Sequence, residues 1–310
     1  MRKALVGYTG FVGSNIAASS EFQGLYNSRN ISRIYDQEYD LVIYAGVLAE
    51  KFIANQEPDK DKEHIDQTIE TIRRIRAKKF VLISTVDVCS DLSMQDEFAE
   101  IVDEKLQPYG RHRFLLEKWV RNNVDSAVVV RLPALYGQGL KKNFIFDAIQ
   151  IAPTMIKSDI YTNMKNRQNA FLDQYYSYES NGFYKLRTLG PCEKQHLKEF
   201  FMQQKFNALS FTDSRNEYQY YPLSSLWNHI QVALENDLKV VCLNSEPISA
   251  AELYRSVFGQ DFVNLVTETP LRYNFRSKFF KLFDGNNGYI FNKPYILADI
   301  KKFIMGQYEK

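Results

Sequence analysis

Residues 3–16 read KALVGYTGFVGSNI, and this stretch decides the fold. A short apolar run, typical of a buried parallel strand, ends at Gly7, and small residues then lead into a helix. Gly7, Gly10 and Gly13 recur at every third position across this turn. The first glycine permits a tight turn, the second lets the backbone approach a pyrophosphate, and the third allows close helix–strand packing. Because a helix N-terminus adds amide donors and a positive dipole, the stretch predicts a dinucleotide site.

Strands and helices alternate through the rest of the first half. Apolar runs predict further strands at residues 24–27, 41–46, 80–83 and 127–132. An isoleucine stripe predicts a helix over residues 59–79, and Pro108 begins another that runs to about residue 121. This order predicts an α/β protein with a Rossmann-type, doubly wound parallel sheet.

The second half has a different pattern. Residues 151–221 are rich in Asn, Gln, Tyr and Phe, and predict one helix at 192–205 within irregular sequence. A helix at 224–236 and a strand at 239–243 follow, and Ser249 and Glu252 form a capping box for a helix that ends before Gly259. We therefore predict a dinucleotide-binding domain at 1–150, with returning elements near 222–245. A smaller, mostly C-terminal substrate-binding region is expected at 151–221 and 246–310.

Composition excludes several classes of protein. The 310 residues carry 39 Lys+Arg against 37 Asp+Glu, and this near-balance argues against a nucleic-acid binder. No apolar run approaches the roughly 20 residues that span a bilayer, and the first residues lack the apolar stretch of a signal peptide. Three scattered cysteines form no disulfide framework. We expect a cytoplasmic protein without a membrane or nucleic-acid partner, and no metal site.

Six motifs resemble those of the extended short-chain dehydrogenase/reductase superfamily, its NAD-dependent epimerase/dehydratase-like branch included. The glycine turn has that superfamily's GxxGxxG spacing, and residues 40–46 resemble its cofactor-lining strand. Residues 81–89 (VLISTVDVC) resemble its SSxxVY strand end, and residues 109–113 (YGRHR) occupy its YxxxK position. Residues 130–137 (VRLPALYG) resemble its RxxNvYGP strand and turn, and residues 220–227 resemble a segment that follows the substrate region.

The resemblance implies site residues. Tyr109 would be the acid–base group, Thr85 would hold the substrate oxygen, and Arg113 would tune Tyr109. The cofactor would contact the glycine turn and the strand ends, namely Gly7, Thr9, Gly10, Phe11, Val12, Gly13, Asn27, Ser28, Arg29, Ala45, Gly46, Ser84 and Pro133.

Arg113 stands where the family has lysine. Tyr109 and Arg113 are i and i+4 on one helix, so their side chains share a face, and a cation there lowers the high pKa of a phenol. A guanidinium cannot copy the position of an ammonium in a packed site. Three interpretations stay open: catalysis with Arg113, an altered mechanism that uses His112 or Asp87, and an inactive cofactor-binding protein.

The second strand and its turn bear on the cofactor. Residues 27–30 offer no carboxylate for an NAD ribose, whereas Ser28 and Arg29 suit an extra phosphate, so we favour NADP over NAD.

The stretch from Gly13 to Ala45 is short for the family. We therefore expect that one strand–helix pair is missing, as in a compact build closer to the dTDP-dehydrorhamnose reductase branch than to the epimerases.

The substrate is the least determined part. Lys141, Lys142 and Asn143 follow the family turn and suit a nucleotide-sugar diphosphate. The preferred interpretation is an NAD(P)-dependent oxidoreductase, epimerase or dehydratase that acts on a nucleotide-linked sugar. The alternative is a catalytically inactive NAD(P)-binding scaffold or sensor. The resemblance also allows a homodimer.

Overall fold

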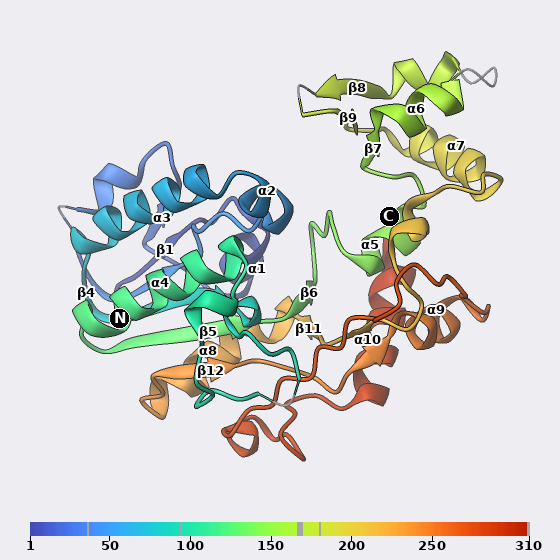
Figure 1. The fold of residues 1–310 in the computed structure, drawn as a ribbon. Coiled ribbons are helices and arrows are strands. Elements are labelled where there is room, and N and C mark those ends of the chain that lie inside the picture. The colour runs from blue at the N-terminus through green and yellow to red at the C-terminus, as the bar shows by residue number, and fades with distance from the viewer. Residues whose placement is uncertain (36, 94, 166–169, 180, 309–310) are drawn as a thin grey trace.

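A six-stranded sheet forms the centre of the protein (Figure 1). The computed structural model describes residues 1–310 except 36, 94, 166–169, 180 and 309–310. Every neighbouring pair in this sheet is parallel. In spatial order the strands are β2 (Gly24–Tyr26), β1 (Lys3–Val6), β3 (Glu38–Tyr44), β4 (Arg76–Thr85), β5 (Ala127–Leu132) and β12 (Val240–Cys242). The Rossmann-type sheet expected from the sequence is confirmed.

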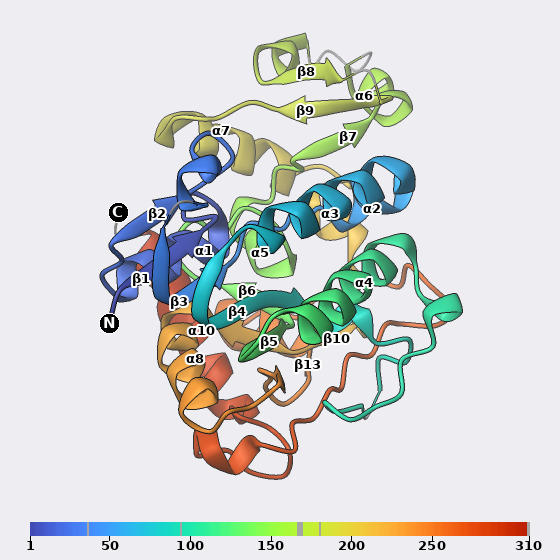
Figure 2. The same ribbon diagram turned by 90° about the vertical axis from the view of Figure 1, so that its left-hand side faces the viewer.

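Helices cover both faces of the sheet. One face packs on α1 (Phe11–Ser19) and α8 (Leu226–Glu235), and the other packs on α3 (Pro58–Arg73) and α4 (Pro108–Asn123). Figure 2 shows α3 and α4 running side by side. Along β1, Leu5 enters the first core while Ala4 and Val6 enter the second. Because both faces are buried, the strands are apolar throughout, which explains why continuous apolar runs predicted them.

The chain reverses direction across the sheet at β1. It goes from β1 out to β2 and then crosses back to β3 on the other side of β1. Between α1 and β3, the described residues form only β2 and a short 3-10 helix, Ile31–Ile34. The expected loss of one strand–helix pair is confirmed, and it places β2 at the edge. The carboxyl ends of the neighbouring strands β1 and β3 form the topological switch point, the place where open α/β sheets bind ligands.

One predicted boundary is wrong. The helix predicted over 59–79 ends at Arg73, and β4 begins at Arg76. Charged residues pair across β3 and β4 in this stretch: Lys78 lies 2.7 Å from Asp40, and Arg76 lies 3.8 Å from Glu38. Cross-strand ion pairs extend a strand beyond its apolar core, and the apolar pattern alone did not reveal them.

Residues 151–211 are more regular than predicted. Besides α7 (Pro191–Met202), they contain α6 (Ser158–Lys165) and a small antiparallel sheet. Its strands are β7 (Met155–Lys157), β9 (Phe183–Leu186) and β8 (Tyr176–Glu179). They enclose an aromatic-rich core, in which the Tyr161 and Tyr184 rings stack 3.8 Å apart. Figure 1 shows this part beyond α5 (Phe144–Gln150), at the upper right.

Two short strand pairs and three helices complete the fold. They are the strand pairs β6 (Ala134–Tyr136) with β11 (Tyr220–Pro222) and β10 (Glu217–Tyr218) with β13 (Ile248–Ser249), together with α2 (Lys51–Gln56), α9 (Ala250–Phe258) and α10 (Lys293–Tyr308). The predicted capping box of α9 is confirmed: Ser249 Oγ accepts from the Glu252 amide at 3.1 Å, and Glu252 Oε2 accepts from the Ser249 amide at 2.9 Å. Gly259 closes the helix with φ at +69°.

Gly110 sets how closely α4 approaches the end of β4. A Cβ at this position would lie 2.1 Å from the carbonyl oxygen of Asp87. Asp87 belongs to a 3-10 turn, Val86–Val88, that directly follows β4. Only glycine therefore lets the first turn of α4 rest on this backbone.

Gly110→Ala should destabilise the fold by about 1–3 kcal/mol, because the added methyl forces α4 off the turn after β4. The matched control is Gly306→Ala in α10, where a Cβ meets nothing within 4 Å. That variant should gain up to about 1 kcal/mol from helix propensity. Urea unfolding followed by circular dichroism measures both. Equal shifts in the two variants would contradict the steric argument.

Candidate functional site

Two of the three glycines in the first turn are required by packing. Gly7 has φ at +87°, and a Cβ there would lie 2.5 Å from the carbonyl oxygen of Ala45. A Cβ on Gly13 would lie 2.1 Å from the carbonyl oxygen of Gly7. These glycines let the turn lie against the end of β3 and let α1 begin directly above it.

Gly10 has no comparable internal reason to be glycine. It is exposed, and its nearest neighbour at a Cβ position is the Gly7 carbonyl oxygen, 3.3 Å away. Gly10 also caps α1, whose first turn has no side-chain cap and no acidic residue. The first-turn amides, from Phe11, Val12 and Gly13, are therefore left for another acceptor. An anion such as a phosphate satisfies them best.

The other predicted cofactor residues follow the ends of neighbouring strands. Ala45 and Gly46 follow β3, Ser84 lies at the end of β4, and Pro133 follows β5. They share one sheet edge with the glycine turn and the exposed Thr9. Ser84 differs in one respect: its hydroxyl donates to Glu117 Oε1 at 2.5 Å, so it is already engaged with α4.

The turn after β2 is built from asparagines. Asn27 Oδ1 accepts from the Arg29 amide at 2.9 Å, and Asn30 Oδ1 accepts from the Asn27 amide at 2.7 Å. This leaves Ser28 and Arg29 exposed at the edge of the sheet.

Tyr109 and Thr85 meet at the carboxyl end of β4. Thr85 is close enough to the Tyr109 hydroxyl to lower its pKa, and Thr85 Oγ1 accepts from the Asp87 amide at 3.2 Å. Tyr109 is only 7% exposed. Burial is the largest influence on its hydroxyl and raises the pKa, while the charge of Arg113 lowers it. The structure thus brings together the two groups that the sequence predicted as partners.

Arg113 contacts the face of the Tyr109 ring. The guanidinium carbon lies 4.1 Å from the ring centroid, a cation–π contact. The same group donates to Asp61 Oδ2 on α3 and, at 2.5 Å, to the carbonyl oxygen of Leu48. Burial opposes ionisation of Asp61, but hydrogen bonds from Arg113 and His112 outweigh it and lower the pKa of that carboxyl.

His112 faces α3. Its Nδ1 lies 2.8 Å from Asp61 Oδ2, and the side chain is buried. The residue that the sequence offered as a substitute catalyst is thus part of the Asp61 cluster.

Three residues beside Tyr109 form a cluster that the sequence did not reveal as a group. The Lys51 ammonium lies 2.8 Å from Asp87 Oδ1 and donates to the Tyr273 hydroxyl at 3.3 Å. Tyr273 in turn donates to Asp87 Oδ1 at 3.2 Å. The only signal for Asp87 was its place after Thr85, and Lys51 and Tyr273 come from segments whose structure was not predicted.

The predicted substrate residues lie in the loop after β6. Lys142 donates to the carbonyl oxygen of Ala49, and burial lowers the pKa of its ammonium. Lys141 is exposed. Asn143 caps α5 instead of projecting from the loop, since its Oδ1 accepts from the Ile145 amide at 3.0 Å and its amide group donates to Leu135 at 2.7 Å.

A buried ion pair lies beneath the site. Arg131 of β5 and Glu117 of α4 are both almost fully buried, and Arg131 Nη2 lies 2.7 Å from Glu117 Oε2. Glu117 also accepts from Ser84. This network ties α4 to the ends of β4 and β5, and so fixes the elements that carry Tyr109 and Thr85.

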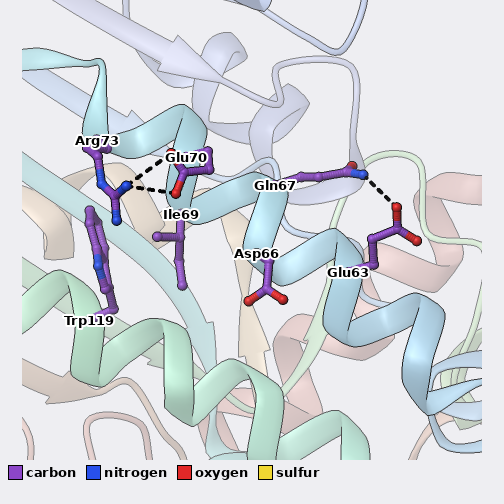
Figure 3. A pocket seen from close by; sticks show the side chains of 7 residues that line it. All are labelled: Glu63, Asp66, Gln67, Ile69, Glu70, Arg73 and Trp119. Atoms are coloured by element: carbon purple, nitrogen blue, oxygen red, sulfur yellow. Dashed lines mark hydrogen bonds and ion pairs between the residues drawn. The ribbon is translucent and has the colours of Figure 1, made fainter.

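Other features lie away from this edge. Figure 3 shows a shallow hollow on α3, lined from Glu63 to Arg73 and bounded by Trp119, near the far end of α4 from Tyr109. Within the described part of the chain, His, Cys, Asp and Glu side chains form no group of three that could hold a metal ion. In the same residues, no helix combines the length and apolarity needed to cross a membrane.

Solved structures share the whole architecture. dTDP-4-dehydrorhamnose reductase from Yersinia enterocolitica is similar over 98% of this chain and 99% of its own, with a TM-score of 0.63 and 13% identity. This chain has the fold of that reductase. The reductase of the same name from Bacillus anthracis, solved with NADP, has a TM-score of 0.62 and 14% identity over 98% of each chain.

An epimerase gives a similar result. A variant of UDP-glucuronic acid 4-epimerase from Bacillus cereus, solved with NAD and a fluorinated UDP-sugar, has a TM-score of 0.58 and 14% identity, covering 99% of this chain and 100% of its own. No family model and no curated protein matches the sequence. At such identities the structural likeness establishes the fold.

Glu117→Gln should destabilise the protein by about 3 kcal/mol or more, because it leaves the Arg131 charge buried without a counter-charge. Asp66→Asn, which breaks the exposed i,i+4 pair with Lys62 on α3, is the control and should cost less than about 0.5 kcal/mol. Chemical unfolding measures both losses. If the two were similar, the buried pair would not be holding α4 in place.

Proposed function

We propose that this chain is an NAD(P)-dependent oxidoreductase or epimerase that acts on a nucleotide-linked sugar. The observation that carries the proposal is the proximity of the Tyr109 and Thr85 hydroxyls at the sheet edge shared with the uncapped glycine turn. A proton-transfer pair and an anion site on one edge are what a dinucleotide-dependent reaction at a carbon–oxygen bond needs.

The first turn fits the pyrophosphate of a dinucleotide. The α1 amides and the space beside Gly10 would hold it, and Ala45, Gly46 and Pro133 would line the same groove. When bound, the nicotinamide supplies or accepts a hydride. Ser28 and Arg29 are exposed after β2, where a 2′-phosphate would gain charge-assisted hydrogen bonds, so NADP is preferred over NAD.

Proton transfer falls to Tyr109. Thr85 would donate to the substrate oxygen and polarise it, and Tyr109 would give its proton to that oxygen or take one from it. Arg113 would stabilise the phenolate through the ring face, where its charge already lowers the pKa of Tyr109. The arginine therefore takes a part of the family lysine's task by a different contact.

The substrate class rests on two lines of support. The reductases and the epimerase of similar fold have sugar nucleotides in their names. In this chain, Lys141 and Lys142 place two ammonium groups on the loop after β6, beside the same cleft edge as Ala49. Positive charge there suits the diphosphate of a nucleotide-linked sugar. Residues 151–221 and 246–310 would complete the substrate region, with 1–150 and the returning 222–245 holding the cofactor.

A catalytically inactive NAD(P)-binding scaffold is the second candidate. Two observations favour it: burial raises the pKa of Tyr109, and Arg113 is tied to Asp61 and Leu48. The following variant separates the two candidates.

Tyr109→Phe should lower turnover about 100- to 10,000-fold while leaving the cofactor dissociation constant nearly unchanged, because the phenol moves a proton and does not hold the phosphates. Turnover is followed by nicotinamide absorbance with a panel of dTDP- and UDP-linked keto sugars, and binding by titration calorimetry. Tyr178→Phe, at an exposed tyrosine of β8, is the control. Cofactor binding without turnover in the parent protein favours the scaffold.

Gly10→Val should weaken cofactor binding at least about tenfold at a modest cost in stability, since the added side chain blocks the pyrophosphate while its Cβ lies 3.3 Å from the Gly7 carbonyl oxygen. Gly190→Val is the matched control, because Gly190 also caps a helix with an extended backbone and an unhindered Cβ position. Calorimetric titration with NADP and with NAD measures the effect. Unchanged affinity in Gly10→Val would remove the dinucleotide site from this turn.

A further inference from the structure

Arg113 leaves one side of Tyr109 without its own cation. Its side chain is only 4% exposed and lies against the face of the ring. Its guanidinium is already shared between the Asp61 carboxylate and the Leu48 carbonyl. Arg113 and Asp61 are thus a nearly neutral unit that cannot turn toward a reacting oxygen without leaving a buried carboxylate unpaired.

Helix α2 brings a second cation near Tyr109, and this cation is more exposed than Arg113. Asn55 Oδ1 accepts from the Tyr109 amide at 3.0 Å, so one face of α2 contacts the first turn of α4. Lys51 lies four residues before Asn55 and therefore shares that face. With 44% of its side chain exposed, Lys51 is on the solvent side of the site.

Asp87 holds the Lys51 ammonium at this place. The carbonyl of Asp87 is the group that Gly110 accommodates, next to Tyr109 in α4, and its carboxylate is 2.8 Å from Lys51 Nζ. Tyr273 accepts a second hydrogen bond from the ammonium. An ammonium has three donors, so one remains for a further acceptor beside Tyr109.

We propose that Lys51 is a positioning residue for the Tyr109 proton transfer, the cation that stabilises the phenolate from the solvent-facing side. The inference deepens the proposed function and rests on it for its catalytic meaning. When Tyr109 gives its proton to the substrate oxygen, the negative charge left on the phenol is attracted by Lys51, and Asp87 limits this attraction by competing for the ammonium. The lysine missing at position 113 is in this way supplied from another helix.

The charged and titratable groups around Tyr109 come from several elements. They are Arg113 and His112 of α4, Asp61 and His64 of α3, Lys51 of α2, Asp87 of the turn after β4, and Tyr273 of the C-terminal segment. Among them, Arg113 and Lys51 lower the pKa of Tyr109, whereas Asp87 raises it together with burial. Asp61 is paired with Arg113 and His112 and is buried, whereas Lys51 and Asp87 form the partly exposed charge pair near Tyr109.

The test reads the ionisation of position 109 without cofactor or substrate. A difluorotyrosine is incorporated at 109 in the full chain, and its titration is followed by fluorine NMR, because fluorine lowers the phenol pKa into an accessible range. Lys51→Gln should raise the midpoint by about one pH unit, Lys51→Arg should restore it, and Asp87→Asn should lower it. Lys60→Gln, an exposed lysine on α3, is the control.

Two outcomes would overturn the inference. One is a midpoint in Lys51→Gln that matches the Lys60→Gln control; the other is a raised midpoint that Lys51→Arg fails to restore. If Lys51 only tethered Tyr273, Lys51→Gln and Tyr273→Phe would lower the melting temperature alike and leave the midpoint in place. Failure of the proposed function gives a different result, because the midpoint would still shift while the parent protein shows no turnover.

Discussion

The contact between the Gly110 backbone and the Asp87 carbonyl determines where the whole candidate site lies. A methyl group at position 110 would overlap that oxygen, so α4 reaches the end of β4 only because the residue is glycine. This approach brings Tyr109 to Thr85, and it brings Asn55 of α2 within 3.0 Å of the Tyr109 amide. The Glu117–Arg131 pair then fixes the same helix to β5 from beneath. One steric constraint and one buried ion pair therefore hold α4, the end of β4 and β5 together.

Charge around Tyr109 is arranged in two pairs of different burial. Arg113 and Asp61 are buried and mutually satisfied, so they form a fixed part of the wall. Lys51 and Asp87 are partly exposed, so their contacts are open to exchange with solvent or with a bound molecule. A fixed pair supplies a constant field, whereas a half-exposed pair responds to what is bound. A single lysine in a YxxxK motif would have to supply both the constant field and the response to a bound molecule, and here two charge pairs divide these effects.

The features set by local sequence were predictable. The glycine turn, the apolar strands and the α9 capping box follow from short-range rules of backbone geometry and burial. The missing strand–helix pair was expected because the stretch from Gly13 to Ala45 is short for the family that the sequence resembles. The start of β4 was wrong because its first residues are stabilised by ion pairs with β3, which lies far from them in sequence. The small β7–β9 sheet was not predicted because its strands are only three or four residues long, too short for a clear alternating pattern.

The candidate site divides in the same way. Tyr109, Thr85 and Arg113 could be found because their segments resemble family motifs, and the i,i+4 spacing then places Tyr109 and Arg113 on one helix face. Their partners could not, because Asp61, Lys51 and Tyr273 reach the site through tertiary packing from segments without a recognisable motif. Ser84 was expected to contact the cofactor, but its hydroxyl donates to Glu117. Asn143 was expected to bind substrate, but its side chain caps the start of α5.

The central sheet ends on both sides in a three-residue strand, β2 on one side and β12 on the other. Unpaired backbone at a sheet margin is a template for strands of foreign chains, and the hazard grows with its length. Both margins are therefore short, and each presents few amides and carbonyls to a strand from another copy of the chain.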